Sequence, residues 1–248
     1  MLRLVMIGLL GISPLLALTV QAGPAERLAE AVRFRTISTQ DPTATNYGEF
    51  ERFNAFLRKT YPRVFSELDV EWVSDYSLML TWPGSDPAAG AILFTAHTDV
   101  VPVEPGTEAD WAHPPFGGVI ADGMVHGRGT LDDKNGVISL LEAVGSLMAE
   151  GFQPRKTVVL AFGHDEEVSG LRGAASLAAR MQELGLHFDW MVDEGGILVS
   201  GNPMLPDRPL ALVAIAEKGY LTLILEASGE GGHSSMPPGE SAIGRLSR

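Results

Sequence analysis

Apolar and polar positions along the chain follow two different periods, and these periods predict helices and strands in alternation. Helical spacing places apolar side chains on one face of four segments, and short β-prone runs lie between and after those segments. The predicted helices are 25–32, 50–57, 134–149 and 170–184, and the predicted strands are 70–73, 78–82, 91–96, 157–162, 190–192, 212–216 and 221–227.

This order of elements predicts an α/β fold. Strands that alternate with helices of this length are typical of a sandwich in which helices cover a largely parallel, mixed sheet. The run 157–162 is apolar throughout, as strands buried on both faces are. Between the third strand and the long helix, residues 102–122 are rich in turn-forming residues, and we expect loops there.

The first 22 residues are predicted to lie outside the fold. Arg3 is the only charged residue in the opening stretch, residues 4–20 are almost wholly apolar, and Val20 and Ala22 are small residues before Gly23. This order is typical of a cleaved secretory signal, and the alternative is an uncleaved membrane anchor. Pro14 within the apolar run favours cleavage. In both cases we expect export, to the periplasm or the medium if cleaved and to the membrane if not.

Composition narrows the chemistry that the fold can carry. The 18 Lys and Arg against 31 Asp and Glu give a net charge of −13, which argues against a nucleic-acid partner because phosphates require a basic face. The chain contains no cysteine, which excludes disulfides and thiolate metal sites. Any bound metal must therefore be held by His, Asp and Glu.

Acidic and imidazole groups gather where predicted strands and one glycine-rich turn end. In α/β sheets, ligands bind at the carboxyl ends of the strands. Residues two apart on an extended chain face the same way, so Asp99 can accept the second ring N–H of His97, as happens for metal-bound imidazoles. The four groups are 97–99, 132–133, 164–167 and 193–194.

Each of these groups taken alone has an ordinary structural explanation. A single acidic pair is most often a solvated loop or a helix N-cap, so the metal hypothesis depends on the four groups occurring together. Of the six histidines, we interpret His97 and His233 as functional candidates, while His164 either caps a strand or belongs to the acidic cluster. The remaining histidines, expected to be structural or exposed, are His113, His126 and His187.

Several motifs in this chain resemble one known family. In order, they are AHTDVVPV at 96–103, GRGTLDDK at 127–134, FGHDEE at 162–167, DEGG at 193–196 and GGHSSMP at 231–237. They are similar to the motifs of carboxypeptidase S, Gly-X carboxypeptidase and the aminoacylases, which are dinuclear zinc metallopeptidases. The resemblance extends from about Phe34 to the last residue.

The resemblance implies a site with two zinc ions. Asp132 holds the position of the aspartate that bridges the ions, and the peptide bond after it is cis in family members. His97 matches the histidine ligand of one ion, and Glu167 matches another ligand. The remaining acidic ligand falls on Asp193 or Glu194, with Asp193 favoured from its spacing after Glu167.

The resemblance also implies the catalytic groups. Glu166 matches the general base, and Asp99 matches the carboxylate that orients the zinc-bound histidine. His233 matches a substrate-binding histidine of the smaller lid domain, which in relatives steadies the oxyanion or the substrate carboxylate, often across a homodimer. The family's last zinc ligand is a histidine far beyond His233, and nothing after His233 in this sequence supplies it.

We therefore interpret the sequence as the N-terminal part of a longer protein. Residues 1–22 are the signal peptide or anchor, 23–214 the first part of a catalytic domain, and 215–248 the beginning of an inserted α+β lid or dimerisation domain.

The expected activity is that of a metallocarboxypeptidase of the Gly-X type, which cleaves short peptides. One alternative is an N-acyl-amino-acid amidohydrolase, since no residue in this part separates the two. Another, of a different class, is a non-catalytic binding or association module that lacks the final metal ligand.

Overall fold

The computed structural model describes residues 22–216, 218–219, 221–229, 231–233, 235–236 and 239–247. The predicted signal segment therefore lies outside the described residues, apart from Ala22. Within the described ranges, no helix is both long enough and apolar enough to cross a membrane. The chain divides into two compact units, Met1–Glu194 and Gly195–Arg248.

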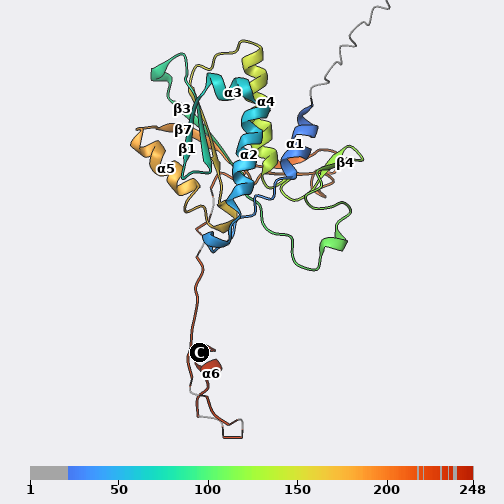
Figure 1. Cartoon of the computed structure of the whole chain (residues 1–248), viewed down its shortest axis with the longest axis vertical. Coiled ribbons are helices and arrows are strands. Elements are labelled where there is room, and N and C mark those ends of the chain that lie inside the picture. The colour runs from blue at the N-terminus through green and yellow to red at the C-terminus, as the bar shows by residue number, and fades with distance from the viewer. Residues whose placement is uncertain are drawn as a thin grey trace, which may run out of the picture. The chain divides into compact units, whose positions relative to one another are not determined.

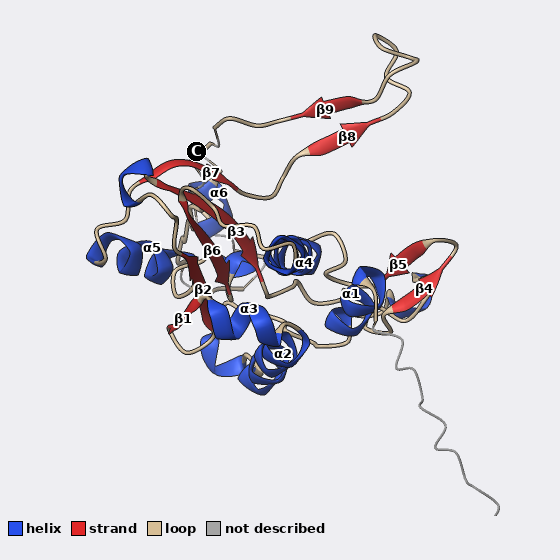
Figure 2. Cartoon of the chain, turned by 90° about the horizontal axis from the view of Figure 1, so that it is seen from above, coloured by secondary structure: helices blue, strands red, loops and turns tan. Residues whose placement is uncertain are grey.

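The first unit is built on a five-stranded sheet, in which Figure 1 labels β1, β3 and β7. The strand order is β1-β2-β6-β3-β7, which can be followed in Figure 2. β3 pairs in parallel with β6 and β7, whereas β2 pairs antiparallel with β1 and β6. β1 thus runs in the same direction as β6, and β2 is the reversed strand of a largely parallel, mixed sheet. The strands are β1 (Asp69–Val73), β2 (Ser77–Trp82), β3 (Ala91–His97), β6 (Thr157–Gly163) and β7 (Phe188–Val192).

Helices cover both faces of this sheet, which confirms the predicted α/β sandwich (Figure 2). Alternate residues of each central strand point to opposite faces. Leu160 and Phe162 of β6 pack with α2, α3 and α4, while Val159 and Ala161 pack with α5. The helices are α1 (Pro24–Val32), α2 (Tyr47–Thr60), α3 (Pro62–Glu67), α4 (Lys134–Ala149) and α5 (Ala174–Glu183).

The turn-rich section between β3 and α4 contains more structure than the sequence predicted. β4 (Val119–Ala121) and β5 (Met124–His126) form a short antiparallel hairpin there. Strands of three residues are too short to show a period in the sequence. Single 3₁₀ turns complete the unit, and they are η1 (Pro42–Ala44), η2 (Pro87–Ala89), η3 (Glu108–Asp110) and η4 (Glu166–Val168).

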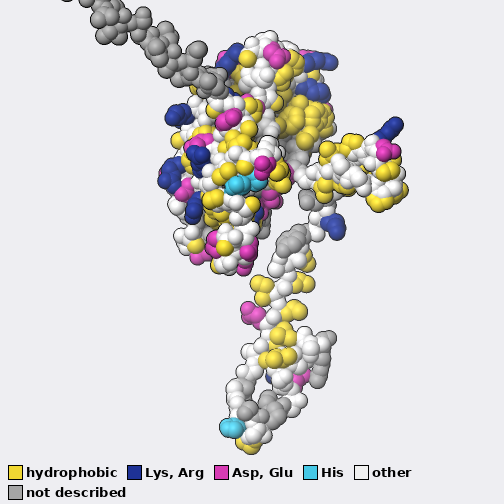
Figure 3. Space-filling view, turned by 90° about the vertical axis from the view of Figure 1, so that its right-hand side faces the viewer, with side chains coloured by type: hydrophobic (Ala, Val, Ile, Leu, Met, Phe, Trp, Pro, Cys, Tyr) yellow, Lys and Arg dark blue, Asp and Glu magenta, His cyan; other side chains and the backbone are white. Residues whose placement is uncertain are grey.

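The second unit contains the hairpin of β8 (Ile197–Val199) and β9 (Leu210–Leu212), and the short helix α6 (Ala242–Leu246). The strand predicted over 212–216 is present only as β9, which ends at Leu212. The strand predicted over 221–227 is wrong for the described residues 221–227, because no described strand pairs with them. Apolar side chains of this unit are exposed, and some are visible in Figure 3.

Candidate metal centre

His97 is the last residue of β3 and lies at the carboxyl end of that strand. β3 lies between β6 and β7, so its end is flanked by neighbours on both sides. The imidazole is buried, and its Nδ1 lies 3.1 Å from the backbone oxygen of Asp99 and 3.2 Å from Asp99 Oδ1. A proton on Nδ1 donated to Asp99 leaves the lone pair of Nε2 free to bind a metal.

Asp99 is held by four donors and joins three segments of the chain. Ser38 Oγ donates to Oδ2 at 2.6 Å, and the backbone N–H groups of Glu166 and Glu167 donate to Oδ1 and Oδ2 at 3.1 Å each. Burial alone would raise the pKa of Asp99, but the hydrogen bonds from His97 and Ser38 outweigh it and hold this pKa below its usual value. Asp99 therefore stays ionised beneath the imidazole.

Asp132 reaches the same imidazole from the turn before α4. Its Oδ1 lies 2.7 Å from His97 Nε2, and the peptide bond between Asp132 and Asp133 is cis, as the resemblance implied. Asp133 caps α4 by accepting the backbone N–H of Gly136 at 3.1 Å, and its other oxygen accepts the backbone N–H of His97 at 3.3 Å. A helix N-cap was the ordinary alternative that the sequence offered for an acidic pair, and Asp133 has this role. The cap also fastens the turn to the end of β3.

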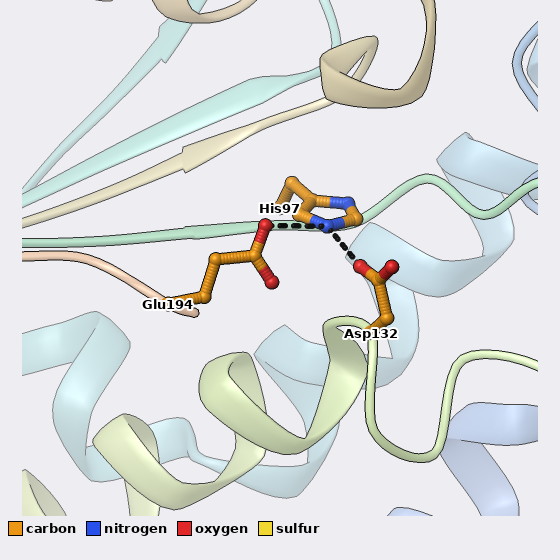
Figure 4. Close-up of side chains that lie close together, drawn as sticks. All are labelled: His97, Asp132 and Glu194. Carbon is orange, nitrogen blue, oxygen red and sulfur yellow. Dashed lines mark hydrogen bonds and ion pairs between the residues drawn. The ribbon is translucent and has the colours of Figure 1, made fainter. Parts of the chain in front are cut away.

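Glu194 supplies the third group, from the loop that follows β7. Its Oε1 lies 3.4 Å from His97 Nε2, and Figure 4 shows the carboxylates of Glu194 and Asp132 pointing at this nitrogen from opposite sides. Asp193, which the sequence favoured, instead accepts the backbone N–H of Glu194 on its Oδ1 at 3.0 Å. The structure thus brings Glu194 rather than Asp193 to the cluster, because adjacent side chains of an extended segment point apart.

The cluster of His97, Asp132 and Glu194 fits a divalent cation. One ligand atom from each residue lies within 4.8 Å of the others. Zinc takes nitrogen and oxygen ligands about 2.0–2.2 Å away, which places tetrahedral ligands about 3.3 Å apart. Burial would lower the pKa of His97, but Asp99 and Glu194 raise it to about 12, which shows how much negative charge surrounds the ring. A metal ion would neutralise this charge.

Glu166 and Glu167 lie beside the cluster, in η4 directly after β6. Glu166 Oε2 is 4.0 Å from His97 Nε2, and about half of this side chain (53%) is exposed. Burial, together with Glu194, Asp99 and Asp132, raises the pKa of Glu166 against the opposing effect of His97. Glu167 Oε1 accepts the backbone N–H of Val101 at 3.2 Å, and burial and Asp132 raise its pKa to about 7.

Other candidate histidines have different surroundings. His164 is buried, its Nδ1 lies 2.7 Å from Ser77 Oγ, and its ring contacts the rings of Tyr47, Phe50 and Tyr76. This environment is that of a structural histidine. His233 belongs to the second unit, where its Nδ1 lies 2.8 Å from Ser235 Oγ.

Comparison with known proteins relates this geometry to a family. The model of peptidase family M20/M25/M40 matches residues 93–235, a stretch that contains His97, Asp132 and Glu194. The chain belongs to this family. Membership confirms the resemblance drawn from the motifs.

Two relatives and one solved structure illustrate the family. The chain is 41% identical over 230 residues to the probable carboxypeptidase S-like 2 of Dictyostelium discoideum, covering 90% of this chain and 44% of that protein. It is 38% identical over 223 residues to the N-fatty-acyl-amino acid synthase/hydrolase PM20D1 of Bos taurus, covering 89% of this chain and 44% of that protein. The chain thus spans less than half the length of these two relatives.

The solved structure is an M20 family metallo-carboxypeptidase, Sso-CP2 from Sulfolobus solfataricus. It aligns with a TM-score of 0.55 at 20% identity, and the alignment covers 70% of this chain and 37% of that one. At this identity the likeness shows the fold alone, and it agrees with the α/β sandwich described above.

Proposed function

We propose that the protein is a zinc-dependent hydrolase that cleaves the amide bond before a C-terminal amino acid, as a carboxypeptidase of the Gly-X type. The observation that carries the proposal is the convergence of His97, Asp132 and Glu194 beside the half-exposed carboxylate of Glu166. A binding module has no use for a free carboxylate next to a metal site, whereas a hydrolase needs one as a base.

His97, Asp132 and Glu194 would hold one zinc ion, and Asp132 would share a second ion with Glu167 and a histidine beyond this chain. Bound zinc supplies Lewis acidity, which acidifies water and polarises the substrate carbonyl. Glu167 supports the second site because its carboxylate lies within the electrostatic reach of Asp132. Asp99 would keep the Nδ1 proton of His97 in place, so that Nε2 stays available.

Glu166 would act as the general base. Its raised pKa makes it a better proton acceptor than an ordinary carboxylate, and its exposure lets water and substrate approach. Glu166 would take a proton from the attacking water as the C–O bond forms. It would then give this proton to the nitrogen as the C–N bond breaks, which releases an acid and an amine.

The proposal also gives roles to segments outside the cluster of His97, Asp132 and Glu194. Residues 1–22 would direct export, and residues 215–248 would begin a lid through which a homodimer forms. His233 would contact the oxyanion or the substrate carboxylate from that lid.

A second candidate is hydrolysis of N-acyl amino acids, and the likeness to an N-fatty-acyl-amino acid synthase/hydrolase favours it. The chemistry at the amide bond is the same, and the two candidates differ in the group on the acyl side. N-acetyl-glycyl-leucine and N-oleoyl-leucine present the same leaving amino acid and therefore separate them.

The test measures leucine release from both compounds by the full-length protein, before and after treatment with a chelator. The proposal expects release that the chelator abolishes and that zinc restores, with the peptide preferred if the enzyme is a carboxypeptidase. Glu166→Gln should keep the bound metal and lose nearly all turnover. Comparable turnover by this variant at equal metal content would remove Glu166 from the mechanism, and no metal-dependent release from either compound would leave the binding-module alternative.

A further inference from the structure

Asp165 is a buried carboxylate to which the proposed mechanism gives no part. It is 4% exposed and lies directly before Glu166, between the end of β6 and η4. Its Oδ2 accepts the backbone N–H of Arg172 at 2.9 Å, and its Oδ1 accepts the backbone N–H of Gly173 at 2.7 Å. Burying a carboxylate is costly unless both oxygens are hydrogen-bonded, and these bonds meet that requirement. They also join the residue before Glu166 to the segment that enters α5.

The backbone oxygen of Asp165 binds the middle of the same loop. It accepts the N–H of Val168 at 3.2 Å and the N–H of Gly170 at 2.8 Å. Between these residues, Ser169 has φ 91°, a left-handed conformation that is uncommon for a residue with a side chain. Residues 165–173, which we call the Asp165 loop, are therefore held in a tight conformation by four hydrogen bonds to one residue.

Close packing also fixes the carboxylate of Asp165. A Cβ at position 173 would lie 2.5 Å from Asp165 Oδ1 and 2.8 Å from the backbone nitrogen of His164. Only glycine at position 173 lets the end of the loop approach the end of β6 this closely. The carboxylate therefore has little room to move, and the two ends of the loop are held together.

A second buried carboxylate, Asp99, fixes the beginning of the Asp165 loop. The backbone N–H groups of Glu166 and Glu167 each donate to Asp99 at 3.1 Å. The backbone of Glu166 is thus held by Asp99 through its own N–H and by Asp165 through the preceding residue. The Glu166 side chain is 53% exposed, with Oε2 4.0 Å from His97 Nε2, so its placement depends mainly on this backbone.

We propose that Asp165 is a positioning residue for Glu166, which it holds beside the metal cluster by closing the loop that carries this side chain. The inference rests on the proposed function, because it assigns a support to the base of that reaction. A general base must lie within hydrogen-bond reach of the proton that it takes. A displacement of about 1 Å can lower a rate by about 100-fold, so a half-exposed base requires a rigid backbone.

Asp165→Asn alters the loop with the smallest change of shape. Asparagine keeps one acceptor oxygen, but its NH₂ group faces the second N–H donor, so the bond to either Arg172 or Gly173 is lost. With whichever of N-acetyl-glycyl-leucine and N-oleoyl-leucine the full-length enzyme hydrolyses, we expect kcat to fall by about 10-fold to 100-fold. KM should change by less than about threefold, and bound zinc should stay the same. Loss of zinc would overturn the inference, because Asp165 would then support the metal and not the base.

The matched control is Asp86→Asn. Asp86 is also an aspartate that accepts a backbone N–H in its own loop, from Ala88 at 3.1 Å. It precedes β3 and therefore lies at the end of that strand opposite to His97. We expect kcat of this variant to stay within about twofold of wild type. An equal loss of kcat in Asp86→Asn and Asp165→Asn would contradict the inference.

A double-mutant comparison separates the positioning of Glu166 from general damage to the fold. In the Glu166→Gln background no base remains to be displaced, so adding Asp165→Asn should lower the residual kcat by less than about twofold. The loss of unfolding free energy, in contrast, should be the same in both backgrounds. The same fold-loss of kcat in both backgrounds would overturn the inference, because the effect would not pass through Glu166.

A second variant covers the case in which Asp165→Asn does not fold by circular dichroism. In Asp165→Ser the hydroxyl can accept one of the two N–H bonds and places no donor against the other. We expect a lower kcat at equal zinc content, and an unchanged kcat contradicts the inference.

Hydrogen exchange of the metal-free, full-length protein tests the positioning without turnover. In Asp165→Asn the amides of residues 172–173 should exchange faster, and those of Glu166 and Glu167 should exchange at least about tenfold faster as well. Asp86→Asn should leave both pairs unchanged. If the wild type hydrolyses neither compound, the proposed function fails, while faster exchange at Glu166 and Glu167 still supports the hold of Asp165 on this segment. Unchanged exchange at Glu166 and Glu167 overturns the inference whatever the activity.

Discussion

Asp99→Asn tests how much the ionised carboxylate beneath His97 contributes to the stability of the fold around the metal cluster. Asp99 is fully buried, and each of its oxygens serves two donors. Asparagine has nearly the same shape, but its NH₂ group replaces one acceptor. If that group takes the place of Oδ2, the hydroxyl of Ser38 can turn to accept from it, while the N–H of Glu167 loses its acceptor.

The expected loss of stability follows from these bonds. One buried N–H without an acceptor costs about 1–3 kcal/mol, and each remaining bond to the former carboxylate weakens by about 1 kcal/mol when the charge is removed. Their sum agrees with the roughly 3–5 kcal/mol found when one partner of a buried ionic network is removed. We therefore expect the free energy of unfolding of the metal-free protein to fall by about 3–5 kcal/mol at pH 7.

Urea unfolding of the metal-free full-length protein measures this change. The control is Asp41→Asn, in which the exposed carboxylate of Asp41 accepts from the backbone N–H and the hydroxyl of Thr43 in its own turn, and we expect a much smaller change there. A loss below about 1 kcal/mol for Asp99→Asn would refute the reasoning, because it would mean that the ionised carboxylate contributes no more than a neutral amide.

The dependence on pH provides a second check of the same prediction. The pKa of Asp99 in the fold is below its ordinary value of 3.8, so the carboxylate binds fewer protons in the folded than in the unfolded chain near that pH. Its stabilisation is complete above pH 3.8 and is lost as the pH falls through the folded-state pKa. The difference between wild type and Asp99→Asn should therefore be constant from pH 7 to about pH 5 and shrink below 3.8. A difference that grows on acidification would contradict this assignment of charge.

Two further predictions concern the ligand set and the core. Glu194→Gln should weaken zinc binding by at least about tenfold in a competition assay, whereas Asp193→Asn should change it by less than about threefold. The reverse order of the two effects would mean that Asp193 is the ligand. Phe53→Ala should lower the free energy of unfolding by about 3–5 kcal/mol because Phe53 is fully buried between α2 and its neighbours. Phe152→Ala is the matched control, since Phe152 is 50% exposed, and equal losses in urea unfolding would contradict the described core.

Local patterns in the sequence were sufficient to predict the main helices and strands of the first unit. The long helix begins at Lys134 and ends at Ala149 as its apolar spacing predicted, and the run 157–162 became the central strand β6. The β4–β5 hairpin, and the absence of a described strand at residues 221–227, could not be predicted in this way. Whether a segment forms a strand depends on its pairing partner, and a local pattern of apolar residues does not identify that partner.

Some contacts of the candidate site could likewise be predicted from the sequence, and others could not. The pairing of His97 with Asp99 follows from strand geometry over two residues and was predictable. Ser38 meets Asp99 across 61 positions of sequence, and no pattern near either residue indicates that contact. The choice between Asp193 and Glu194 depends on which way the backbone turns after β7, since the two side chains are adjacent and point apart.

The most direct test of the account is a zinc titration of the metal-free, full-length protein, comparing wild type with Asp132→Ala. Asp132 is the carboxylate nearest to His97 Nε2 and the one that would serve both ions. The account predicts two bound zinc ions in wild type and a loss of tight binding at both sites in Asp132→Ala, with the fold retained by circular dichroism. Unchanged stoichiometry and affinity in Asp132→Ala would contradict the central claim that Asp132 and His97 form a metal centre.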